Sequence, residues 1–102
     1  MLNAENTIKC RKILERNGQV LQMMKVSEEC AELSQAVCKI LEEPLTRDHS
    51  PERIEANQEN FKEEVVDVLV VATQAVMIAG LSEEEINRRA KEKLDKELNK
   101  PH

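Results

Sequence analysis

The segment from Glu63 to Gly80 constrains the fold of this chain more than any other part of the sequence. Its apolar residues do not alternate with polar ones, and they continue for longer than a strand normally does. In a helix, at about 100° per residue, Glu64 and Asp67 lie within about 60° of each other. The same stripe carries the apolar residues Phe61, Val68, Val71, Ala75 and Ile78. The sequence therefore predicts a long helix with two carboxylates on an apolar face.

Carboxylates in such a position need a partner. Burying an ionised carboxylate without a cation or a hydrogen-bond donor is strongly unfavourable, so such groups are rarely left bare. We therefore expect this helix to hold a positive charge at Glu64 and Asp67.

The rest of the chain also favours helices. Only one residue, Phe61, is aromatic, whereas Ala, Leu, Val, Glu and Lys are abundant, which suits helices better than a sheet. A length of 102 residues is enough for one modest core and not for two. We therefore expect one all-α domain over residues 1–102, with Met23 and Met24 as core filler.

Breaks in the sequence divide the chain into four expected helices. Gly18 stops the first helix, Pro44 follows the second, and Gly80 ends the third. Ser82 and Glu85 form a capping box that opens the fourth. The expected helices are Ala4 to Asn17, Gln19 to about Glu42, Pro51 (or, less tidily, Asn57) to Gly80, and Ser82 to about Asn99, with a loop from Glu43 to Ser50. We expect the second and third helices to be central and antiparallel.

A second acidic group lies on the second helix. Glu28, Glu29 and Glu32 occupy an arc of about 100° on a helix. If this arc faces Glu64 and Asp67, four or five carboxylates converge without a histidine or thiol, which favours Mg²⁺ or Mn²⁺ over zinc.

These acids have two other interpretations. One is an ordinary solvated helix face, with the glutamates paired to Lys25 and Lys39. The other is a di-iron carboxylate bundle, which needs two Glu-x-x-His pairs. The only histidines are His49, in the expected loop, and His102, at the end of the chain, so the di-iron site is excluded.

The charge and the cysteines of the chain limit its possible partners and its compartment. The net charge of −5 disfavours stable nucleic-acid binding, because such binding depends on Lys and Arg neutralising phosphates. The three cysteines form no Cys-x-x-Cys pair and fit small core residues in a reducing cytoplasm. No signal peptide is evident and no apolar run is long enough to span a bilayer, so we expect a soluble, cytoplasmic protein without a membrane partner.

The two acidic motifs resemble a known signature. Glu28-Glu29-x-x-Glu32-Leu33, followed by Glu64-x-x-Asp67-Val68, is similar to the motif of the MazG-like, all-α nucleoside triphosphate pyrophosphohydrolases. The likeness covers roughly Gln19 to Leu94 and includes the segment from Gly80 into the basic last helix. It implies a four-helix unit that forms dimers or tetramers, binds Mg²⁺, and converts a nucleoside triphosphate to the monophosphate and pyrophosphate.

The resemblance also implies residue roles. The metal ligands would be Glu29, Glu32, Glu64 and Asp67. Glu28 would be a further ligand or the base for the attacking water, and Lys93 would face the phosphates. Lys91 departs from the family, since many members have Asn there. Lys91 and Asn60, which lies one turn before Glu64 on the same stripe of the helix, are the candidate substrate contacts.

The third helix also bears on assembly. It carries Val66, Val70 and Met77 on the side away from the carboxylates, so it is apolar nearly all round. A domain this small has difficulty covering both faces of such a helix, so we expect a homodimer or homotetramer. The alternative function is a non-catalytic helical domain that serves oligomerisation or regulates a partner.

Overall fold

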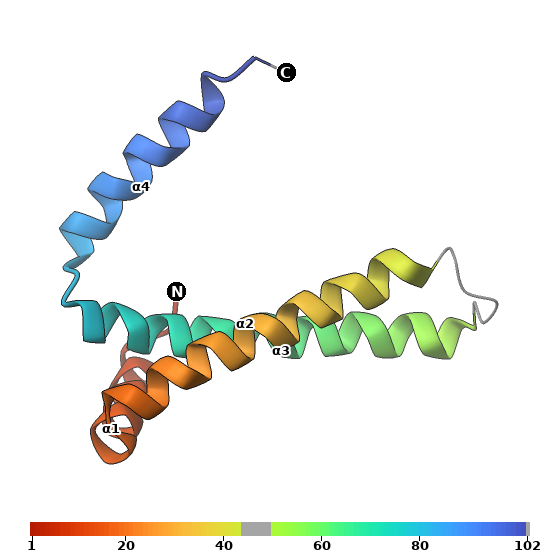
Figure 1. Ribbon diagram of the computed structural model, residues 1–102, viewed down its shortest axis with the longest axis horizontal. Helices are drawn as coiled ribbons and strands as arrows, with labels where there is room; N and C mark the ends of the chain where they lie inside the picture. Colours follow the sequence, from red (N-terminus) through yellow and green to blue (C-terminus); the bar gives the residue numbers. More distant parts are fainter. Residues whose placement is uncertain (44–49, 102) are drawn as a thin grey trace.

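The computed structural model describes residues 1–43 and 50–101. These residues form four helices: α1 (Ala4–Asn17), α2 (Gln19–Glu42), α3 (Pro51–Ala79) and α4 (Glu83–Leu98) (Figure 1). No strand occurs in either described range, so the predicted all-α class is confirmed. Most of the expected Glu43–Ser50 loop, with Pro44 and His49, lies outside the described residues, as does His102.

The helix ends follow from local chemistry. Ser50 Oγ accepts a hydrogen bond from the Arg53 backbone N–H at 3.3 Å, with Pro51 as the first helical residue of α3. Ser82 Oγ accepts one from the Glu85 N–H at 3.1 Å, which caps α4. The third helix thus begins at Pro51 rather than near Asn57.

Two helices, α2 and α3, lie side by side for most of their length, and α1 packs against both (Figure 1). Near the start of α2, Gln22 bonds to Gln74 near the end of α3; at the other end, Asn57 of α3 donates to Glu43 at 3.0 Å. The fully buried apolar residues of the described chain are few: Cys10, Leu14, Ala36 and Val71.

Some residues that were expected in the core are not buried. Met23 and Met24 are 57% and 63% exposed, and Cys30 and Cys38 are also exposed, so only Cys10 behaves as a core thiol. In their place the core contains amides. Gln22 and Gln74 retain only 2% and 1% of their accessible surface.

The fourth helix departs from the expected four-helix unit. The chain bends by 111° between α3 and α4, and α4 projects away from the other helices (Figure 1). Gly80 allows this bend because it adopts the left-handed conformation, with φ at 68°. No residue of α4 is buried, so the packed unit of one chain contains three helices.

No single helix in residues 1–43 and 50–101 is long and apolar enough to cross a membrane. Only α3 and α4 taken together, as a bent pair, meet the requirements of length and composition.

Candidate metal centre

Three carboxylates from two helices converge on one point. One oxygen each from Glu29, Glu64 and Asp67 lies within 4.8 Å of the others. Glu64 and Asp67 share a face of α3 because they are three residues apart, and Glu29 comes from α2. Three of the four or five carboxylates that were expected to converge therefore do so.

Two of the three converging residues carry a buried oxygen without a partner. Glu29 Oε2 and Glu64 Oε2 are shielded from solvent, and neither accepts a hydrogen bond within the described residues. A desolvated anionic oxygen without a donor is costly, so each of these atoms favours binding either a proton or a cation.

The electrostatics of the cluster point the same way. Burial is the main cause that raises the pKa of Glu29 above its ordinary value, and the charge and hydrogen bonding of Glu32 add to it, followed by Asp67 and Glu64. The pKa of Glu64 is raised by burial, then by the charges of Glu32 and Asp67. Like charges crowded in a partly desolvated site disfavour the ionised form until a positive charge enters.

Glu32 belongs to the same electrostatic cluster, because its charge acts on both Glu29 and Glu64. All four predicted ligands therefore lie in one region. Sequence reasoning missed Glu63, whose charge also raises the pKa of Glu64. Its position directly before Glu64 was the available signal.

The expected lysine partners do not neutralise the cluster. Lys25 is half-buried and Lys39 exposed, and neither forms an ion pair with an acid of the described helices. The interpretation of these acids as a lysine-paired face is therefore not supported by the contacts. An uncompensated set of carboxylate oxygens suits a hard divalent cation such as Mg²⁺ or Mn²⁺.

The remaining predicted site residues are not gathered at the cluster. Glu28 is exposed on α2 and lies outside the group of three converging acids. Asn60 is half-buried on α3, one turn before Glu64. Lys93 and Lys91 are exposed on α4, where Lys91 pairs with Asp95 of the same helix at 2.6 Å. Within one chain, the predicted phosphate-binding lysines lie on α4, whereas the converging acids lie on α2 and α3.

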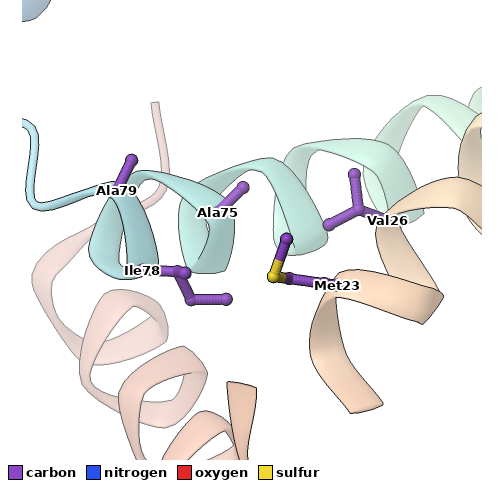
Figure 2. Close-up of a pocket in the computed structure, with 5 residues that line it drawn as sticks. All are labelled: Met23, Val26, Ala75, Ile78 and Ala79. Atoms are coloured by element: carbon purple, nitrogen blue, oxygen red, sulfur yellow. The ribbon is translucent and has the colours of Figure 1, made fainter. Parts of the chain in front are cut away.

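An apolar groove lies between the start of α2 and the end of α3. Met23 and Val26 from α2 face Ala75 and Ile78 from α3, around a volume of about 330 Å³ (Figure 2). The groove contains no polar side chain and is distinct from the acidic cluster.

No protein-family model, curated protein or solved structure matches this chain.

Proposed function

We propose that this protein is a Mg²⁺-dependent nucleoside triphosphate pyrophosphohydrolase of the MazG-like kind. It would convert a ribo- or deoxynucleoside triphosphate to the monophosphate and pyrophosphate, a reaction that removes unwanted nucleotides from the cellular pool. The observation that carries the proposal is the pair of buried, unpartnered oxygens of Glu29 and Glu64, which face Asp67 in a cluster without a cationic side chain. The two acidic motifs supply the likeness to the family.

In this proposal Glu29, Glu32, Glu64 and Asp67 hold Mg²⁺, with Mn²⁺ as a substitute. When bound, the ion supplies positive charge for the phosphate oxygens and lowers the pKa of a bound water. The antiparallel arrangement of α2 and α3, inferred from the bonds at both ends of the pair, lets ligands from the two helices face one another.

The other residues act on substrate. The oxygen of a water attacks the α-phosphorus, the bond from that phosphorus to the bridging oxygen breaks, and pyrophosphate leaves. Glu28 takes the proton of the water, and Lys93 neutralises charge on the departing pyrophosphate. Asn60 contacts the sugar or base, and Lys91 contacts the phosphates.

The shape of the chain supports assembly into a homodimer or homotetramer. Its accessible surface is 8070 Å², whereas a compact monomer of this mass exposes only about 5,900 Å². Its radius of gyration is 17.1 Å, against about 13 Å for a compact domain of this length. Large apolar side chains are exposed on every helix, among them Ile8, Val20, Met24, Leu41, Val66, Leu94 and Leu98.

Assembly also explains the separation of acids and bases. Because α4 leaves its own three-helix core, Lys91 and Lys93 would reach the acidic cluster of a second copy rather than their own. The complete site would then contain residues from two chains.

The second candidate function is a non-catalytic helical domain that serves oligomerisation or regulates a partner. One observation favours it: the bases of α4 pair within their own helix, as Arg89 does with Glu85 at 2.9 Å and Lys91 with Asp95. Millimolar Mg²⁺ or Mn²⁺ separates the two functions. The enzyme gains thermal stability from the metal by mass action, and the scaffold does not.

The decisive experiment measures pyrophosphate release from a panel of ribo- and deoxynucleoside triphosphates. Glu32→Gln and Asp67→Asn should each lower turnover by at least about a hundredfold, because each removes a charged ligand, while the helical circular dichroism spectrum is retained. Glu83→Gln, at the exposed start of α4, is the matched control and should keep full activity. Activity of both site variants equal to that of the parent would overturn the proposed site.

A further inference from the structure

The largest fully buried side chains of the described residues are two amides rather than apolar groups. Gln22 Nε2 donates to Gln74 Oε1 at 2.8 Å, and Gln74 Nε2 donates to the Cys10 carbonyl oxygen at 3.1 Å. Asn17 Nδ2 donates to Gln22 Oε1 at 2.8 Å. One chain of hydrogen bonds thus joins α1, α2 and α3. Every amide hydrogen bond in it depends on the position of both partners along their helices.

This amide pair has a fixed relation to the acidic cluster. Gln22 precedes Glu29 by seven residues on α2, and Gln74 follows Asp67 by seven on α3. Seven residues are close to two helical turns, or about 10 Å. The two pairs therefore lie on the same seam between the helices, and the register that joins the amides also joins the carboxylates.

We propose that Gln22 and Gln74 are positioning residues that fix the register of α2 against α3 and thereby assemble the metal ligands. The link to metal binding rests on the function proposed above, whereas the register itself does not. The two residues touch no substrate in this proposal. They act through the position of Glu29 relative to Asp67.

The register needs such a device because apolar contacts alone specify it weakly. Beside the amide pair, α2 and α3 meet through Met23, Val26, Ala75 and Ile78, which leave a groove between them (Figure 2). The unbranched side chain of Met23 adapts to more than one packing. A slip of seven residues would set Glu29 opposite Gln74 or Asn60 instead of Asp67, which separates the acids. It would also break the Gln22–Gln74 hydrogen bond and take each amide away from the partner it has in the native register.

Two variants separate positioning from stability. Gln22→Met removes one partner and leaves Gln74 Oε1 buried without its donor, so the melting temperature of the metal-free protein should fall. Gln22→Met combined with Gln74→Met replaces both partners by apolar side chains of similar length. The double variant should therefore melt at the same temperature as the single variant or higher. Leu14→Ala is the matched control, because it removes buried packing from α1 and leaves the amide pair intact.

The first measurement is the dissociation constant of Mn²⁺, titrated by electron paramagnetic resonance. We expect both amide variants to bind Mn²⁺ at least tenfold more weakly than the parent, with no recovery in the double variant. Leu14→Ala should melt at a lower temperature and bind Mn²⁺ as the parent does. A folded double variant that binds Mn²⁺ with the affinity of the parent would overturn the positioning role.

The second measurement reads the register directly. Nuclear Overhauser effects between the methyl groups of Met23 or Val26 on α2 and those of Ala75 or Ile78 on α3 report the native register in the metal-free protein. We expect these signals to weaken or double in the double variant, and signals identical to the parent would contradict the proposal. If the parent binds no Mn²⁺, the proposed function fails, and this second measurement alone decides the register.

Discussion

Glu29 and Glu64 are held where their ionised forms are least favourable. Burial and the neighbouring acids raise the pKa of both above the ordinary value of 4.5. Each therefore links the stability of the metal-free protein to protonation, and each becomes a favourable ligand once a cation is present.

The first consequence concerns charge removal. Glu64→Gln should raise the melting temperature of the metal-free protein, because it eliminates one member of a repelling, partly desolvated cluster. The same change should abolish the stabilisation that millimolar Mg²⁺ gives to the parent. Calorimetry with and without Mg²⁺ measures both effects, and Glu59→Gln, on an exposed part of α3, is the control. A lower metal-free melting temperature for Glu64→Gln would contradict the electrostatic argument.

The second consequence concerns pH. Because the pKa of Glu29 and Glu64 is higher in the folded chain than in the unfolded one, the folded state binds protons first as the pH falls. The stabilisation that comes from protonating these two carboxyls is complete below pH 4.5, and it is lost as the pH rises through their raised pKa values in the folded chain. The metal-free protein should therefore become more stable as the pH falls from about 7 to about 5.

Thermal unfolding across that pH range tests the prediction, and the double variant Glu29→Gln, Glu64→Gln should show a flatter dependence. With Mg²⁺ present the trend should reverse, because protons compete with the metal for the same oxygens. A metal-free melting temperature that falls steadily below pH 7 would contradict the assignment.

The helices are joined at two glycines that adopt positive φ, Gly18 at 86° and Gly80 at 68°. Neither position is crowded, since nothing lies within 4 Å of an added Cβ. The cost of a side chain there is thus set by backbone conformation. Gly80 occupies the left-handed helical region, whereas Gly18, with ψ at 160°, lies in a region that is almost exclusive to glycine.

This difference predicts an order of effects. Gly80→Ala should destabilise the fold by about 1 kcal/mol, and Gly18→Ala by up to about 3 kcal/mol. Urea unfolding monitored by circular dichroism measures both values. Equal costs at the two positions would show that the connections relax, and that the α1–α2 turn is not held in the observed conformation.

The molecule as a whole has an accessible surface of 8070 Å², more than a compact monomer of its mass exposes, and α4 projects from the other helices (Figure 1). This helix buries none of its residues, yet its apolar residues Ile86, Ala90 and Leu94, spaced four apart, share nearly the same face. In solution we expect that face to be covered by a second copy.

Removing α4 tests this expectation. A chain ending at Ser82 should lose dimers or tetramers in sedimentation equilibrium and should lose hydrolysis, because Lys91 and Lys93 are absent. It should still bind Mn²⁺, because the acids lie on α2 and α3. Glu92→Gln, on exposed α4, is the control for charge alone. A parent chain that is monomeric at micromolar concentration would refute the assembly.

The sequence by itself determined the local structure. Periodicity identified four helices, and the hydrogen bonds of Ser50 and Ser82, with the positive φ of Gly18 and Gly80, place their ends close to the expected residues. It also identified two acidic faces, Glu28, Glu29 and Glu32 on α2 and Glu64 and Asp67 on α3, because spacings of three and four residues define one face of a helix without any tertiary information.

The tertiary structure decided which side chains are buried and which elements meet. The sequence gives no sign that Gln22 and Gln74 occupy the centre while Met23 and Met24 are exposed, since burial depends on the rotation of α2 against α3. Nor does it show that α4 projects at 111° from α3, because a glycine permits a bend without setting its direction. Local propensities act over a few residues, whereas register and orientation are set by contacts between residues as distant as Gln22 and Gln74.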